Sequence, residues 1–149
     1  MPTHSQGSLD NLNTCEYDLK RLFTAVVEDY DNTIMEGHRP EERQNALFDS
    51  DPPRTKVRFP DGKHNSLPSK AVDSAPYIKG RGIPWPDKKN KPETYYKDLA
   101  QFYHYAGYVQ GRAKEMGIGI RWGGDWDKDW DLNDQTFDDL VHFELTDGD

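Results

Sequence analysis

Two long amphipathic stretches, separated by proline-rich and polar segments, most constrain how this chain can fold. In residues 14–30 and 93–116, apolar side chains recur at three- and four-residue steps, so that each stretch has one apolar face. Residues 50–69 and 79–93 between them are rich in proline, glycine and charged residues, which favours loops. We therefore expect two long helices joined by extended loops. Their apolar stripes are Leu12, Cys15, Leu19, Leu22, Phe23, Val26 and Tyr30 in the first, and Leu99, Phe102, Tyr103, Ala106, Val109, Ala113 and Met116 in the second.

Shorter patterns complete the expected fold. Pro40 followed by two acidic residues suits the first turn of a third helix that ends near Phe48, because proline fits the first helical position and acids favour the positive end of the dipole. Strand-like pieces lie in residues 32–39, 70–78, 119–126 and 142–146. Three helices and about four short strands that do not strictly alternate predict an α+β domain with a small, mainly antiparallel sheet.

Length and composition set limits on the function. The 149 residues suit one domain spanning 1–149, in which we expect residues 1–11 to be a flexible tail, and we expect a monomer. A net charge of −8 argues against nucleic acid or anionic lipid as the main partner. No stretch approaches 18 apolar residues, and the N-terminus lacks the pattern of a signal peptide, so we expect synthesis in a cytoplasm without membrane insertion. The single cysteine, Cys15, excludes an internal disulfide and a cysteine-based zinc site.

Two histidines and one aspartate are candidates for a metal site. His64 lies in the loop before the strand that carries Asp73, and His142 opens the last strand. Such a set leaves a fourth zinc position for water, which is typical of a catalytic zinc. Hydrolysis also needs a carboxylate to take a proton and a positive charge near the oxyanion. We expect Asp139 to serve as the first, on the same side of a helical turn as His142, and Arg39 as the second. Two histidines and an aspartate also occur at such spacing by chance. The sequence pattern alone therefore does not exclude ordinary structural roles for these residues.

Four sequence motifs in order resemble one family. They are "GHRPEERQNALF", "KHNSLPSKAVDSAPY", "IRWGGDW" and "FDDLVHFEL". Together they resemble the M15 zinc peptidases, a family that groups bacterial D-alanyl-D-alanine carboxypeptidases and dipeptidases with phage L-alanyl-D-glutamate endopeptidases. The resemblance runs from about Leu12 to Leu145 and is nearest to the short phage-type members. It implies a hedgehog/D,D-peptidase-like fold, with helices around an antiparallel sheet and the metal on the open face of that sheet.

The resemblance also implies roles for particular residues. It implies one zinc ion per chain, bound by three ligands, with an acid/base and an oxyanion-stabilising arginine beside it. By position these are His64, Asp73 and His142 as ligands, Asp139 as acid/base, Arg39 at the oxyanion, and Gln44 at the matching glutamine.

Two departures from the family pattern concern the substrate. His64 and Asp73 lie farther apart than in the commonest form, which fits a longer variant associated with phage proteins. The serine that usually stands two residues before the histidine is Gly62 here, so Ser66 or Ser69 could replace its substrate contact. Trp122, beside two glycines, is either part of a packed strand with a bend or the wall of a cleft that holds a peptide.

The sequence therefore predicts a zinc-dependent murein peptidase. The best match is a phage endolysin-type L-alanyl-D-glutamate endopeptidase that waits in the host cytoplasm and then acts on peptidoglycan in the cell wall. One alternative is a D-alanyl-D-alanine carboxypeptidase or dipeptidase. Another is a non-catalytic, metal-containing module that binds murein or a protein, although such a module would have no need of a base. We interpret the acidic run in residues 125–139 as a solvated loop rather than a cation site.

Overall fold

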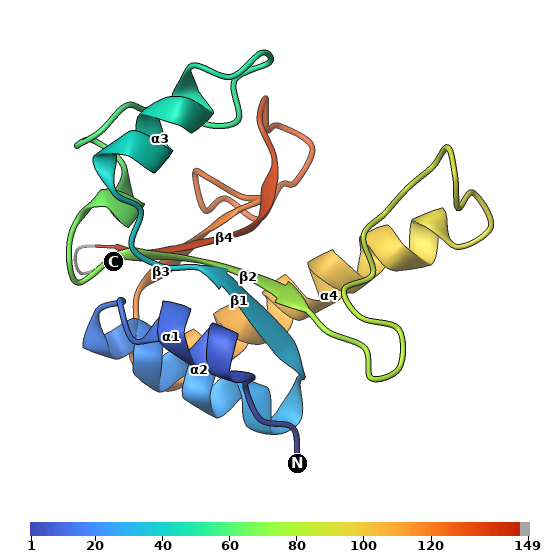
Figure 1. Ribbon diagram of the computed structural model, residues 1–149. Helices are drawn as coiled ribbons and strands as arrows, with labels where there is room; N and C mark the ends of the chain where they lie inside the picture. The colour runs from blue at the N-terminus through green and yellow to red at the C-terminus, as the bar shows by residue number, and fades with distance from the viewer. Residues whose placement is uncertain (147–149) are drawn as a thin grey trace.

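One antiparallel sheet organises residues 1–146, the part of the chain that this computed structural model describes (Figure 1). Its strands are β1 (Asn32–Glu36), β2 (Ala71–Pro76), β3 (Ile120–Gly123) and β4 (Asp139–Leu145), in the order β1-β2-β4-β3. β2 lies between β1 and β4, and the β2–β4 register pairs Asp73 with His142. Two predicted metal ligands are therefore neighbours across the centre of the sheet.

Helices flank this sheet. They are α1 (Gln6–Leu12), α2 (Tyr17–Asp29), α3 (Glu41–Phe48) and α4 (Tyr95–Glu115), with a short 3₁₀ helix, η1 (Lys63–Asn65). α2 and α4 pack together on one face, whereas α3 and η1 stand on the opposite side (Figure 1). The three predicted helices lie where the sequence places them, within a few residues at each end. The predicted α+β class with an antiparallel sheet is confirmed.

The N-terminal segment corrects one expectation. Residues 1–11 were expected to form a flexible tail, but from Gln6 onward they form α1, which packs beside β1. The Ser5 hydroxyl caps the helix by accepting a hydrogen bond from the Ser8 amide at 3.2 Å. The Ser8 hydroxyl in turn accepts one from the Ile34 amide at 3.0 Å. α1 therefore covers the edge of β1, and its short apolar pattern explains why the sequence did not predict it.

The apolar core fills the space between the sheet and the two long helices. Phe143 of β4 is fully buried there, with its ring 5.7 Å from that of Phe23 on α2 and 6.1 Å from that of Tyr105 on α4. Val72 of β2 points into the same core. Because side chains alternate along a strand, the neighbours of these residues, Asp73 and His142, face the other side of the sheet.

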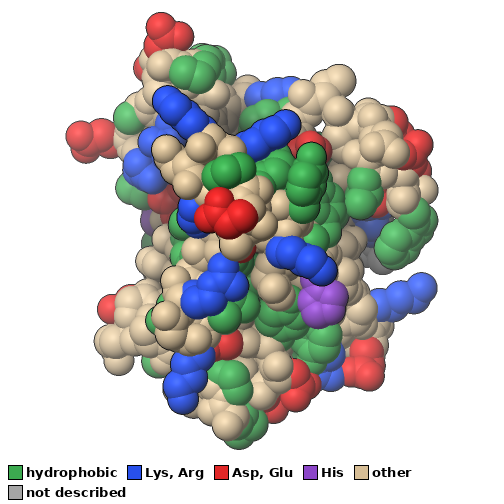
Figure 2. Space-filling view, turned by 90° about the vertical axis from the view of Figure 1, so that its right-hand side faces the viewer, with side chains coloured by type: hydrophobic (Ala, Val, Ile, Leu, Met, Phe, Trp, Pro, Cys, Tyr) green, Lys and Arg blue, Asp and Glu red, His purple; other side chains and the backbone are tan. Residues whose placement is uncertain are grey.

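The segment that joins β2 to α4 extends away from the sheet (Figure 1). Asp98, in the first turn of α4, is buried and ties this segment down, because it accepts a hydrogen bond from Thr94 at 2.8 Å and pairs with Arg81 at 3.2 Å. Figure 2 shows this side of the molecule, where Lys and Arg side chains are spread among hydrophobic ones. Within residues 1–146, no helix is both long enough and apolar enough to cross a membrane.

Candidate active site

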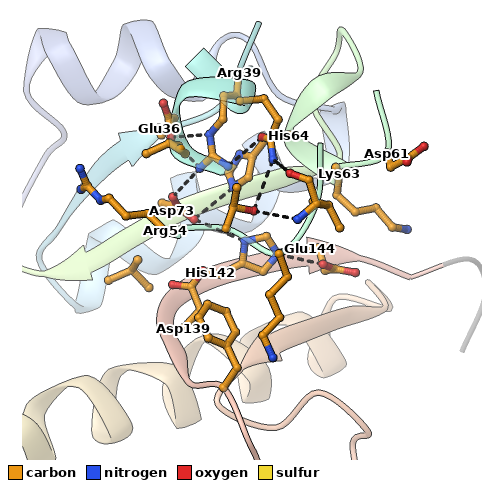
Figure 3. A pocket seen from close by; sticks show the side chains of 18 of the residues that line it. Glu36, Arg39, Arg54, Asp61, Lys63, His64, Asp73, Asp139, His142 and Glu144 are labelled. Atoms are coloured by element: carbon orange, nitrogen blue, oxygen red, sulfur yellow. Dashed lines mark hydrogen bonds and ion pairs between the residues drawn. The ribbon is translucent and has the colours of Figure 1, made fainter. Parts of the chain in front are cut away.

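A cavity of about 580 Å³ lies between β4, the C-terminal part of β1, and the α3–η1 region (Figure 3). Its floor is the face of the sheet that α2 and α4 leave open. The cavity brings together six of the eight predicted site residues. These are Arg39, Gln44, His64, Asp73, Asp139 and His142.

Three of these side chains converge at the floor of the cavity. Nε2 of His64 lies 3.1 Å from Oδ1 of Asp73, and Nδ1 of His142 lies 3.5 Å from the same oxygen. One ligand atom from each of the three residues falls within 4.8 Å of the others. The three donors come from η1, β2 and β4, so the sheet register together with the 3₁₀ turn assembles the cluster.

Each histidine of the cluster is held by its outer ring nitrogen. Nδ1 of His64 lies 2.7 Å from the carbonyl oxygen of Gly37, and Nε2 of His142 lies 2.8 Å from Oε1 of Glu144. Because each of these acceptors needs a hydrogen from the ring, the outer nitrogen is the donor, and the inner nitrogen faces Asp73. Carbonyl and carboxylate acceptors behind metal-binding histidines fix the tautomer and the ring orientation in the same way. The cluster therefore has the donors, the convergence and the support that a divalent metal such as zinc requires.

Gly37 has a second role in this arrangement. A β-carbon at this position would collide with the carbonyl oxygen of Asn11 and the hydroxyl of Thr14. Only glycine therefore lets the end of β1 approach the segment after α1 while its carbonyl reaches His64.

Electrostatic interactions among the three side chains favour their close approach. Burial raises the pKa of Asp73, but hydrogen bonds from His142 and His64 outweigh burial and hold this pKa well below its usual range. Burial lowers the pKa of His142, yet the bonds to Asp73 and Glu144 outweigh burial and raise this pKa to about 9. A metal bound here would replace the proton that His142 shares with Asp73.

Asp139 reaches the same cavity by an irregularity in the sheet. The register between β3 and β4 shifts between the pairs Trp122–Phe143 and Gly123–Asp139, because β4 contains more residues than β3 over this stretch. The shift interrupts the usual alternation, so Asp139 and His142 both line the cavity. Asp139 thus belongs to a strand, and the expected helical turn is wrong, although the expected juxtaposition with His142 is present. Gly123 permits the shift, since a β-carbon there would collide with the Asp139 backbone.

The environment of Asp139 suits proton transfer. Burial and the negative charge of Asp73 both raise its pKa. A carboxyl group whose pKa moves toward neutrality exchanges protons more readily in the neutral pH range than an exposed aspartate does.

Arg39 connects the cluster to the wall of the cavity. Its guanidinium donates to Glu36 from Nη2 at 2.7 Å and from Nε at 2.9 Å, and lies 3.4 Å from Oδ2 of Asp73. Nη1 donates to Oε1 of Gln44 at 3.0 Å. Gln44 is completely buried and also donates to the carbonyl of Val57 at 2.6 Å. Gln44 therefore fixes both the arginine and the loop opposite it.

Two weaker predictions do not agree with the structure. Ser69 is fully buried outside the cavity lining, with its hydroxyl donating to the Ala71 carbonyl at 2.7 Å. Trp122 is packed in the apolar core, where its indole nitrogen donates to the Leu140 carbonyl at 2.9 Å. Neither side chain faces the cavity, so both have structural roles. The next tryptophan, Trp126, is the one that lines the cavity, with its ring 5.3 Å from that of His142.

Sequence reasoning missed two acidic residues of the site. Glu144 lies two residues after His142 and thus on the same face of the strand, a spacing that could have identified it. Glu36, which binds Arg39 and Arg43, carried no comparable signal. A second group of acids, Asp125, Asp127 and Asp129, lies close together in the loop after β3.

The fold and the site together define the class of protein, an α+β peptidase with a histidine–aspartate centre in an open cleft. The chain belongs to the phage L-alanyl-D-glutamate peptidase family, whose family model matches residues 3–146. This confirms the resemblance to the phage-type members of the M15 peptidases.

Two known proteins are similar to this chain. The L-alanyl-D-glutamate peptidase of Escherichia phage T5 is 28% identical over 138 residues, which cover 87% of this chain and 85% of that protein. The crystal structure of the Serratia marcescens L-Ala D-Glu endopeptidase ChiX has the same fold, with a TM-score of 0.66, 24% identity, and coverage of 97% of this chain and 90% of that one.

Proposed function

We propose that this protein hydrolyses the bond between L-alanine and D-glutamate in the stem peptides of bacterial peptidoglycan, with one zinc ion held by His64, Asp73 and His142. The family and the activity named for the phage T5 relative support the reaction. The observation that carries the metal is the paired support of the two imidazoles by Gly37 and Glu144, which directs both inner nitrogens toward Asp73.

The chemistry requires a nucleophile, an acid/base and charge stabilisation. When bound, zinc polarises the scissile carbonyl and lowers the pKa of a water molecule to about 7. Asp139 accepts the proton of the attacking water and then delivers it to the leaving amine nitrogen. The burial that raises the pKa of Asp139 helps this second step, because the protonated carboxyl is easier to form.

Arg39 is proposed to stabilise the oxyanion that forms during the attack. It lines the cavity, it is buried, and its contacts with Glu36 and Gln44 hold the guanidinium in place. A fixed cation in a site of low polarity stabilises developing negative charge more strongly than a mobile one at the surface, because it needs no reorganisation during the reaction.

The test is the digestion of purified peptidoglycan, with the released fragments analysed by mass spectrometry. We expect new N-terminal D-glutamate and free C-terminal L-alanine on the fragments. A chelator should stop the release, and added zinc should restore it. Cleavage that continues after the metal has been removed and shown to be absent would contradict the zinc mechanism while leaving the bond assignment intact.

The same digestion separates the two alternatives. If free D-alanine is the only product, the protein is a D-alanyl-D-alanine carboxypeptidase. If the protein binds peptidoglycan and zinc but releases nothing, it is a binding module. The position of Asp139 beside the cluster favours catalysis, because binding alone needs no proton acceptor.

A further inference from the structure

We infer that Arg54 and Lys56 form a carboxylate-binding subsite in the cleft, which recognises the carboxylate that the D-glutamate of the substrate keeps free beside the scissile bond. The inference rests on the proposed function and extends it to substrate selection. Both residues belong to the segment between α3 and η1, and both line the cavity that contains the histidine–aspartate cluster; Figure 3 labels Arg54 there.

Five lysine and arginine side chains line this cavity, and three of them already have partners in the protein. Arg39 and Arg43 both bind Glu36, at 2.7 Å and 3.2 Å. Lys63 donates to the carbonyl of Leu145 at 3.3 Å. These three side chains therefore form contacts that stabilise the structure of the site.

Arg54 and Lys56 differ from these three cations in their partners. Among residues 1–146, neither side chain forms an ion pair with a carboxylate. The ammonium group of Lys56 lies over the ring of Phe137, 4.8 Å from its centre, and this ring also lines the cavity. Both side chains are exposed to solvent, so the structure presents two positive charges to whatever enters the cleft.

The backbone that carries these two charges is fixed on both sides. The Arg54 amide donates to the Leu47 carbonyl at 2.9 Å. The buried Gln44 donates to the Val57 carbonyl at 2.6 Å and lies 3.3 Å from the Thr55 hydroxyl, to which it also donates. Because Gln44 also binds Arg39, the subsite is held at a set position relative to the reacting centre.

The substrate supplies a matching anion. A glutamate whose amine is acylated by alanine still has two carboxyl groups, and a linear peptide continues through only one of them. The other stays ionised, a few bonds from the scissile nitrogen. In a chain with a net charge of −8, and next to Asp73 and Asp139, such an anion would be repelled without local cations. Arginine suits this task, since its planar donors match a carboxylate in two places.

Three synthetic peptides test the subsite, all containing the L-alanyl-D-glutamate bond. In the first, the free carboxylate is on D-glutamate and the C-terminus is an amide. In the second, both groups are amides. In the third, only the C-terminal carboxylate is free. We expect wild type with zinc to cleave the first about 10- to 100-fold better than the second in kcat/KM, the range typical of charge-assisted hydrogen bonds.

The variant Arg54→Gln/Lys56→Gln should lose this preference, so that its kcat/KM for the first peptide falls to about that for the second. Arg58→Gln is the matched control, because Arg58 lies on the same segment but pairs with Asp49 at 2.7 Å outside the cavity lining. It should keep the full preference. An equal loss on all three peptides would overturn the inference and give these residues a structural role. A preference for the third peptide would assign the subsite to a chain end instead.

Binding measurements make this test independent of cleavage. With zinc-loaded Asp139→Asn protein, calorimetry should show tighter binding of the first peptide than the second, and the double glutamine change should abolish the difference. Equal affinities would overturn the subsite even if the bond is cleaved. A clear difference in affinity without any cleavage by wild type would support the subsite and contradict the proposed function.

Discussion

The two faces of the central sheet use the same strands for opposite purposes. On the face covered by α2 and α4, Val72 and Phe143 are fully buried in an apolar core. On the open face, their immediate neighbours Asp73 and His142 form a polar cluster at the floor of the cavity. A single residue step along β2 or β4 therefore moves from the core to the site.

The difference shows how stability and chemistry are divided in a small domain. Apolar burial on the covered face stabilises the fold without directional contacts. The open face buries ionisable groups, which costs free energy unless each group has a partner. Here the partners are other site residues, such as Glu36 for Arg39 and Glu144 for His142. We therefore expect changes on the covered face to affect folding and changes on the open face to affect activity.

The largest effect is expected on the open face. Changing His142→Ala removes a proposed metal ligand, so zinc binding and hydrolysis of peptidoglycan should both be lost. Metal analysis of the purified protein and release of soluble fragments measure the two results. His104→Ala is the control, because His104 is an exposed histidine that contacts Tyr30 on the far side of the core. A His142→Ala protein that retains zinc would remove this residue from the ligand set.

The adjacent residue should respond in the opposite way. Phe143→Ala leaves a cavity among Phe23, Tyr105 and the sheet, and it should lower the free energy of unfolding by about 3–5 kcal/mol. Denaturant unfolding of the metal-free protein measures this loss. His142→Ala in the same assay should cost less. A comparable loss for both would show that the two faces are not separated in the way that we describe.

Asp139→Asn should affect the chemical step alone. The change keeps the size and the hydrogen-bonding capacity of the side chain but removes the proton acceptor, so kcat should fall at least about 100-fold. Zinc content should match wild type, because the three ligands are unchanged. If hydrolysis of peptidoglycan proceeds at the normal rate, Asp139 is not the acid/base; if zinc is lost, Asp139 is part of the metal site.

Metal binding should stabilise the fold from the open face. Zinc at about 100 times its dissociation constant should raise the free energy of unfolding by about 2.7 kcal/mol, because it binds only the folded cluster. Thermal unfolding with zinc, and then with a chelator, measures the gain and its reversal. The same titration on His142→Ala provides the baseline, and equal stabilisation of both proteins would place the zinc elsewhere.

The smallest effect is expected far from both faces. Gly107 is an exposed residue of α4, and a β-carbon there would contact nothing within 4 Å. Gly107→Ala should therefore stabilise the protein by up to about 1 kcal/mol through helix propensity alone. Activity on peptidoglycan should be unchanged. A destabilised variant would show that this surface of α4 has a packing role that the glycine serves.

Local sequence patterns were enough to predict three of the four helices. The apolar periodicity of residues 14–30 and 93–116 corresponds to α2 and α4, and Pro40 with its following acids marks the start of α3. These predictions succeeded because helix formation depends on residues three and four positions apart. α1 was missed since its stability comes from contacts with β1, such as the bond between Ser8 and Ile34, which no short pattern reveals.

The histidine–aspartate cluster was predicted in composition but not in geometry. Motifs shared with a known family identified His64, Asp73 and His142, yet their convergence depends on the pairing of β2 with β4. The place of Asp139 required the register shift opposite Gly123, which the sequence led us to interpret as a helical turn. Trp122 and Ser69 could not be told from cleft residues, because burial is a property of the folded chain.

The sequence by itself determined three of the four helices, the fold class, the family and the three residues of the histidine–aspartate cluster, because periodicity and motif order can be read directly along the chain. Only the tertiary structure decided which carboxylate orients His142, which tryptophan lines the cavity, and that Arg54 and Lys56 line the same cavity as the cluster. Those facts depend on contacts between distant segments. Their physical cause is the position of the segment from α3 to η1 beside the open face, which places side chains from distant parts of the chain around one cavity.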